Sequence, residues 1–572
     1  MFNRLTFASA AALLGLAACA PDPAPAPAAP EPQLLLPLPE ATTPDINAAD
    51  LAIRIKTLAD DIFEGRGPGT PAGEASADWI AAEMARIGLT PGGDNGSWFQ
   101  SVKMVNQAVD PATSELVVTW PDQDELSLAF KEQAVFWTKH QNTNSVSFEP
   151  TDVVFVGYGA VAPEYGWDDY ASQDYAGKTV IMLVNDPGFA TGDPALFNGK
   201  AMTYYGRWTY KFEEAARQGA TAALVIHETE PASYGWDVVA GSWTGAQSDL
   251  VRANGGADRA LIEGWITRDM AAEMFAKAGL DLEVMKTAAK TRGFAPVTLE
   301  GLKIRGTVNQ TIDAQTSRNV VGILPGATTP DEYVLYTAHW DHLGMKQGQP
   351  GDDFYQDDIF NGAVDNATGS AAILEIAEAM KAQTLDRSAL FLAVTLEESG
   401  LLGSAYYAEN ATVPLSKIVA GINIDGALPI GRTRDMVVVG YGASQLEDLL
   451  KGVVAKQDRE IKPDQSPQAG FFYRSDHISF AKKGVPMLYA DGGEDKIDGG
   501  VAAGKAAAMA YTVERYHKPM DEYSDDWDLS GFVEDVQALY EVGLGIAQSA
   551  DWPTWYPGNE FEAARKESLG QN

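Results

Sequence analysis

The stretch YVLYTAHWDHLG, residues 333–344, decides the fold. It begins as the apolar run of a buried β-strand and changes to polar residues where such a strand would end. Two later stretches have the same plan, ALFLAVTLEE at 389–398 and KIVAGINID at 417–425. Nearly continuous apolar runs are typical of parallel strands that are buried on both faces.

Helical patterns alternate with these strands, for example TGSAAILEIAEAMKA at 368–382 and FVEDVQALYEVGLGIA at 532–547. The alternation predicts an α/β fold with a doubly wound mixed sheet. Ligands of such sheets gather at the carboxyl ends of the strands. The polar residues of all three stretches stand at those ends, so we expect the functional site there.

His339 and Asp341 follow the first strand. Being two residues apart, they point the same way if extended geometry continues. A metal-bound histidine usually donates its second ring N–H to a carboxylate, and Asp341 is placed for that role. His342 is also available, and spacing does not choose between the two histidines.

Three more acidic residues stand at critical positions. Asp365 precedes a helix, where it can cap the helix or bridge two metal ions. Glu397 and Glu398 end an apolar strand, where two adjacent charges are costly unless a cation compensates. One of them can bind metal while the other serves as general base.

Asp425 ends the third strand, and His517 lies in a turn forced by Pro519. Together with one histidine of the first strand, Asp365 and one of the two glutamates, they offer three carboxylates and two imidazoles, a donor set that suits two zinc ions roughly 3.5–4 Å apart. The chain has one cysteine, Cys19, in its N-terminal segment. The predicted zinc site therefore uses only His, Asp and Glu.

The chain closely resembles the co-catalytic dizinc aminopeptidase family, which includes bacterial aminopeptidase S and the glutamate carboxypeptidases. Seven stretches carry the resemblance and run in the family's order from about residue 55 to 530: LADDIFEGRGPGTPAG (58–73), TAHWDHLG (337–344), NGAVDNATG (361–369), EESGLLGS (397–404), NIDGA (423–427), YRSDHISF (473–480) and YHKPMDEY (516–523).

The resemblance implies two zinc ions per chain and assigns their ligands. One ion would be held by His339 and Asp425, the other by Glu398 and His517, and Asp365 would bridge them.

The resemblance also assigns roles beside the metals. Asp341 would orient His339, and Glu397 would take a proton from the bridging water. Tyr516 would donate to the tetrahedral oxyanion, and Arg474 would help to hold the substrate. A cis peptide bond is expected between Asp365 and Asn366.

Two nearby features have other interpretations. His477 is interpreted as a residue that either supports the ligands from behind or lines the substrate pocket, and not as a ligand. The loop with Asp352, Asp353, Asp357 and Asp358 could bind calcium, cover the site or simply be solvated.

The N-terminal segment is typical of an exported lipoprotein. Arg4, the apolar run 5–18 and Cys19 have the plan of a signal peptide (1–18), and LAAC resembles the bacterial lipobox. We expect Cys19 to carry the lipid anchor, followed by a Pro/Ala-rich linker at 19–48. The expected location is the bacterial outer membrane, periplasm or cell surface.

The sequence patterns divide the folded part of the chain into two domains and a tail. The peptidase domain would comprise 49–144 and the dizinc catalytic part 301–552, with a C-terminal tail at 553–572. Residues 145–300 contain alternating strands and helices and resemble a protease-associated domain, a smaller α/β insert.

The formal net charge of −37 argues against binding to nucleic acid. The predicted activity is that of an aminopeptidase acting on peptides. The alternatives are a carboxypeptidase or dipeptidase of the same fold, a one-zinc glutaminyl cyclase, and a non-catalytic receptor that would have lost ligands.

Overall fold

The computed structural model describes residues 34–171, 173–346 and 357–571. The predicted signal peptide, Cys19, the linker up to residue 33, and Asp352 and Asp353 lie outside the described residues. In the described part, no helix combines the length and the apolar character needed to cross a membrane.

The larger unit is built on a mixed sheet with four parallel strands at its centre. Their order is β17 (Arg387–Val394), β14 (Thr329–His339), β18 (Ile418–Asn423) and β21 (Met487–Gly492). Beyond β17 the sheet continues through the antiparallel pairings of β13 (Val297–Leu324) with β17, β1 (Thr90–Pro91) and β2 (Phe99–Val109). Beyond β21 it continues with the antiparallel strand β19 (Asp435–Val438), which pairs in parallel with β20 (Glu460–Pro463). The predicted mixed α/β sheet is confirmed.

Helices cover both faces of this sheet. One face packs against α1 (Ala48–Leu58), α2 (Pro71–Ile87), α9 (Thr368–Lys381), α11 (Leu446–Val454) and α14 (Ser530–Ala547), which share one apolar core. The other face packs against α10 (Leu402–Glu409), α12 (His477–Ala481) and the segment leading into α15 (Glu562–Ser568). Helix α13 (Gly500–Glu514) buries only Gly504.

A second sheet forms the smaller unit. Its strands are, in order, β4 (Glu125–Ser127), β3 (Glu115–Thr119), the first half of β13, β6 (Ser145–Phe155), β9 (Thr179–Leu183), β10 (Ala222–His227), β12 (Ile262–Thr267) and β5 (Ala134–Trp137). Its helices are α3 (Pro187–Thr191), α4 (Trp208–Arg217), α5 (Thr229–Ala232), α6 (Trp236–Ser242), α7 (Arg268–Lys277) and α8 (Leu282–Ala289).

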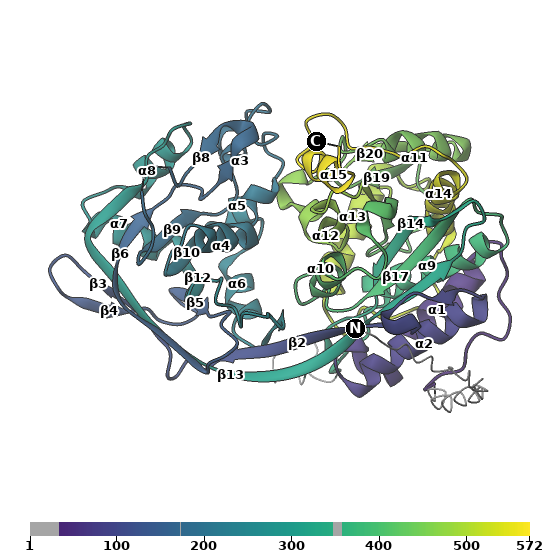
Figure 1. Ribbon diagram of the computed structural model, residues 1–572, viewed down its shortest axis with the longest axis horizontal. Coiled ribbons are helices and arrows are strands. Elements are labelled where there is room, and N and C mark those ends of the chain that lie inside the picture. The colour runs from purple at the N-terminus through teal and green to yellow at the C-terminus, as the bar shows by residue number, and fades with distance from the viewer. Residues whose placement is uncertain (1–33, 172, 347–356, 572) are drawn as a thin grey trace, which may run out of the picture.

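The 28-residue strand β13 belongs to both sheets. Together with β2 it forms the ribbon that joins the two units in Figure 1. Strand β11 (Gln247–Leu250) pairs with the outer edge of β2. Two short hairpins complete the fold: β7 (Val161–Ala162) with β8 (Trp167–Asp168), and β15 (Gly344–Met345) with β16 (Ile359–Phe360).

The strand pairing places two boundaries differently from the sequence patterns. Strands β3, β4 and β5 pair within the smaller unit, which therefore starts near residue 115 instead of 145. The expected C-terminal tail at 553–572 packs on the larger unit, where Trp555 and Phe561 are buried. Both differences come from contacts between residues far apart in the sequence, which local patterns do not reveal.

Candidate metal centre

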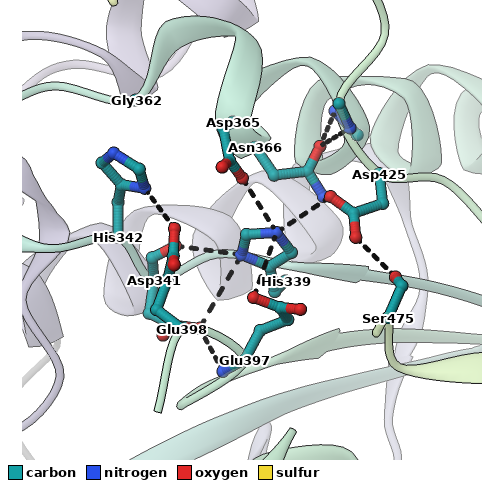
Figure 2. Close-up of polar contacts among 12 residues, drawn as sticks. His339, Asp341, His342, Gly362, Asp365, Asn366, Glu397, Glu398, Asp425 and Ser475 are labelled. Atoms are coloured by element: carbon teal, nitrogen blue, oxygen red, sulfur yellow. Dashed lines mark hydrogen bonds and ion pairs between the residues drawn. The ribbon is translucent and has the colours of Figure 1, made fainter. Parts of the chain in front are cut away.

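The candidate ligands meet at one edge of the larger sheet because its central strands are parallel. His339 is the last residue of β14, Glu397 and Glu398 follow β17, and Asp425 follows β18. Asp365 lies in the irregular turn η5 (Ala363–Ala367) that leads into α9. Figure 2 shows His339 at the centre, with carboxylates around its ring.

The first group of donors surrounds His339, whose side chain is 1% exposed. Its Nε2 lies 3.1 Å from Oδ1 of Asp425 and 3.2 Å from Oδ1 of Asp365. These three side chains offer ligand atoms close enough to hold one metal ion.

The second group shares Asp365. Oδ2 of Asp365 lies 3.3 Å from Nε2 of His517, and that nitrogen lies 3.1 Å from Oε2 of Glu398. The other oxygen of Glu398, Oε1, lies 2.6 Å from Nδ1 of the buried His342. Glu398 therefore contacts both histidines, and His342, Asp365 and Glu398 also offer atoms that could hold an ion.

Asp341 and Glu397 lie beside the first group. Oε2 of Glu397 is 4.0 Å from Nε2 of His339, and its backbone N–H donates to Oδ1 of Asp341 at 3.1 Å. Nδ1 of His339 lies 3.0 Å from the backbone oxygen of Asp341, whereas the Asp341 carboxylate is 3.9 Å away. Strand β14 ends at His339, so the extended geometry that would aim the carboxylate at the ring does not continue.

Burial and mutual contact shift the pKa values of the acidic groups. Burial, with the carboxylates of Asp425 and Glu398, raises the pKa of Glu397 well above its usual value. Burial also raises the pKa of Asp341 to about 8. For Asp365 burial acts upward as well, but hydrogen bonds from His339 and His517 hold its pKa well below the usual range.

The surrounding carboxylates raise the pKa values of the two histidines, His339 and His517. Burial would lower the pKa of His517, yet Glu398 and Asp365 raise it to about 10. The pKa of His339 rises well above its usual value for the same reason, because Asp425 and Glu397 outweigh its burial. Without a metal ion, these shifts favour the protonated rings, whose positive charge would balance the carboxylates of the cluster.

The backbone around the cluster is unusual at three points. The peptide bond between Asp365 and Asn366 is cis, which confirms the expectation. Leu396 and His517 have φ values of 59° and 56°, in the left-handed region that a bulky residue rarely occupies. Positive φ values in such residues persist where the surrounding structure holds them, often at functional sites.

Two supporting residues were not singled out from the sequence. The carboxylate of Asp521 accepts the backbone N–H groups of Val364 and Asp365, each at 3.1 Å. The hydroxyl of Ser475 donates to Oδ2 of Asp425. Both lie inside stretches that carry the family resemblance, YHKPMDEY and YRSDHISF, which was the available signal.

The remaining candidates differ in how they approach the cluster. Tyr516 stacks on the ring of His517, with centroids 3.9 Å apart. Arg474 lies over the ring of Phe471 and, among the described residues, makes no hydrogen bond or ion pair with the ligand group. His477 is fully buried in an apolar setting, and burial lowers its pKa to about 3.

The donor chemistry fits a pair of zinc ions. Zinc binds imidazole nitrogen and carboxylate oxygen, and both groups of donors supply one histidine and carboxylates around the shared Asp365. Buried carboxylates at this density need compensating cations. A separate cavity of about 730 Å³ lies in the smaller unit, and none of these ligands lines it.

Comparison with known proteins places the site in a family. Residues 319–540 match the model of peptidase family M28. Aminopeptidase NAALADL1 of Mus musculus is 33% identical over 132 residues, which are 22% of this chain and 16% of that protein. Aminopeptidase YwaD of Bacillus subtilis (strain 168) is 30% identical over 126 residues, which are 22% of this chain and 24% of that protein.

The chain thus spans about a quarter or less of the length of these two relatives.

Among solved structures, the aminopeptidase from Aneurinibacillus sp. strain AM-1 gives a TM-score of 0.47 at 17% identity, covering 88% of this chain and 94% of that one. The matched segment contains every candidate ligand from His339 to His517. The part of the chain from residue 319 to 540 belongs to peptidase family M28.

Proposed function

We propose that this protein is a zinc-dependent aminopeptidase that removes N-terminal residues from peptides. One observation carries the proposal: Asp365 contacts His339 through one carboxylate oxygen and His517 through the other. A carboxylate that faces two separate donor groups is suited to bridge two metal ions. The family match and the relatives named aminopeptidases support the same conclusion.

The contacts among these side chains support a division of the ligands between the two ions. His339 and Asp425 would hold one zinc, Glu398 and His517 the other, and Asp365 both. When bound, zinc supplies Lewis-acid polarisation of a carbonyl and lowers the pKa of water.

Glu397 is placed to move the proton. Its carboxylate faces the ligand group but is not needed to complete either set of donors. It would accept a proton from the attacking water and return it to the leaving amine. The carboxylate of Asp341 would hold Glu397 in place by accepting the backbone N–H of Glu397. Tyr516 would donate its O–H to the developing oxyanion.

The arginines of the catalytic part favour an aminopeptidase over a carboxypeptidase. A carboxypeptidase site needs cationic groups that are free to bind the substrate carboxylate. Arg432 and Arg434 are instead paired with Glu534 and Asp495 at 2.6 and 3.0 Å. Of these three arginines, Arg474 alone has no carboxylate partner among the described residues, and one arginine does not make the cationic cluster that a substrate carboxylate needs; it would contact another part of the substrate.

A substrate panel tests the proposal. The purified chain should release about two zinc ions, hydrolyse aminoacyl-anilides, lose activity to a chelator and regain it with zinc. N-acetylated peptides with free carboxyl ends should not be cleaved. Cleavage of those peptides from the carboxyl end would replace the aminopeptidase with a carboxypeptidase, and a single zinc per chain would favour a glutaminyl cyclase.

We also propose export and lipid anchoring through Cys19, with the smaller unit acting as a protease-associated domain. The motif around Cys19 and the strand–helix alternation of the smaller unit support these assignments. In a bacterial host, wild-type protein should fractionate with membranes and Cys19→Ala should not. Equal membrane binding of both would refute the anchor.

A further inference from the structure

Arg66 is a buried cation whose hydrogen bonds all go to backbone carbonyls. It ends the turn η1 (Asp61–Arg66), and the residue is 1% exposed. Nε donates to the carbonyl of Trp340 at 2.7 Å, and Nη2 donates to that of Gly362 at 2.7 Å. Nη1 donates to the carbonyls of Leu58, at 2.8 Å, and Asn361.

Three of these four carbonyls belong to the two loops that carry metal ligands. Trp340 stands between His339 and Asp341, and Gly362 stands three residues before the bridging Asp365. The backbone of Arg66 adds a further bond to the first loop, because its carbonyl accepts the N–H of His342 at 3.2 Å. One residue therefore holds both loops at once.

The charge of Arg66 has no ion-pair partner among the described residues. Burial lowers its pKa to about 10, while the carboxylates of Asp521, Asp365 and Asp341 act in the opposite direction. A buried guanidinium is costly unless its donors are satisfied. Here the planar fork of N–H groups fits a set of carbonyls that the two loops present together.

A role through charge alone does not explain this arrangement. A fixed cation repels metal ions, so the charge of Arg66 by itself would weaken metal binding at the neighbouring site. Any benefit to metal binding must come from geometry, namely the relative position of the loop with His339 and the turn with Asp365. Removing a group that orients a metal ligand commonly lowers metal affinity 10–100-fold.

We propose that Arg66 is a positioning residue. It fixes residues 339–342 and 361–365 relative to each other, so that His339 and Asp365 lie at the distance a metal ion requires. The inference rests on the proposed dizinc site. It assigns a task to the LADDIFEGRGPGTPAG stretch, which contributes no ligand of its own. The zinc content of the wild-type chain tests the dizinc site, and the variants below test Arg66.

The experiment measures zinc affinity of the full chain by competition with a chromogenic chelator, and melting temperature with and without zinc. Arg66→Lys keeps the charge but loses the fork, and Arg66→Met loses both. We expect each variant to bind zinc at least 10-fold more weakly and to gain less melting temperature from zinc than the wild type. If Arg66→Met fails to fold, Arg66→Lys decides the matter.

Arg565 provides the matched control. It is 5% exposed and donates to the carbonyls of Ile418 and Val419, at the end of β18 opposite to Asp425. Arg565→Met should lower the melting temperature with and without zinc while zinc affinity stays unchanged. Wild-type zinc affinity in Arg66→Lys would overturn the proposal, because charge or general stability would then account for Arg66.

Discussion

The adjacent glutamates after β17 have different surroundings, which suit the different roles proposed for them. Glu398 contacts His342 and His517, and these contacts, against the effect of burial, lower its pKa to about 2. Glu397 has no histidine closer than 4.0 Å, and burial raises its pKa. The first carboxylate is thus held ionised, which suits its proposed role as a ligand, whereas the raised proton affinity of the second suits its proposed role as the proton acceptor.

Replacing Glu397 tests this division. Glu397→Gln should lower kcat by about 10²–10⁴-fold, because the variant loses its proton acceptor but keeps the shape of the site. Zinc content should stay at the wild-type level, whereas Asp365→Ala should lose zinc. Steady-state kinetics with metal analysis checks both. Wild-type turnover in Glu397→Gln would exclude Glu397 as the base.

Zinc uptake should release protons and become tighter as pH rises. In the metal-free site the pKa of His517 is raised to about 10 and that of His339 is also raised, so both rings carry protons at pH 7. Zinc binds only the neutral ring and must displace them. Affinity should therefore increase with pH up to about 10.

Calorimetry in two buffers of different ionisation enthalpy measures the protons released. The same zinc-binding enthalpy in both buffers at pH 7 would show that the rings were already neutral, contrary to this expectation.

Among the elements, the turn η1 packs closely against the β15–β16 hairpin near the site. Gly65 has a φ of 68°, and a Cβ there would lie 2.5 Å from the carbonyl oxygens of Gly344 and Phe360. These oxygens belong to the hairpin β15–β16, which lies within the segment between His342 and Asp365. Only glycine lets η1 approach the hairpin closely enough for Arg66 to reach both loops.

Gly65→Ala should destabilise the chain by about 1–3 kcal/mol through left-handed strain, with a further cost from the clash. Gly96→Ala is the control, since its φ is 77° but a Cβ there meets nothing within 4 Å. Its cost should be only the conformational one, about 1–2 kcal/mol. Urea unfolding compares the two, and equal destabilisation would show that the contact with the hairpin is unimportant.

At the scale of the whole molecule, distant segments complete the larger unit. Trp555 is 3% exposed and donates its indole N–H to the carbonyl of Gly484 at 2.9 Å. Arg565, in the same C-terminal segment, donates hydrogen bonds to the carbonyls of Ile418 and Val419 at the start of β18. The last residues thus cover the face of the sheet opposite to α9 and α14.

Trp555→Ala should cost about 3–5 kcal/mol, the usual range for emptying a buried aromatic site. Glu567→Ala, at an exposed position of α15, should change stability by no more than about 0.5 kcal/mol. Thermal unfolding of both variants measures the difference. A melting temperature of Trp555→Ala equal to that of the control would mean that the segment does not stabilise the fold.

The sequence by itself determined the strands at β14, β17 and β18, the helix after Asp365, and the polar residues at the strand ends, because burial and periodicity leave local patterns. Local patterns did not show which histidine faces Glu398, because His342 and His517 meet at this residue only after folding.

Only the tertiary structure assigned β3–β5 to the smaller unit and gave Asp341 a backbone contact with His339. It also brought Arg66 beneath loops that lie more than 270 residues further along the chain. These features depend on pairing and packing between distant segments, which no local spacing encodes.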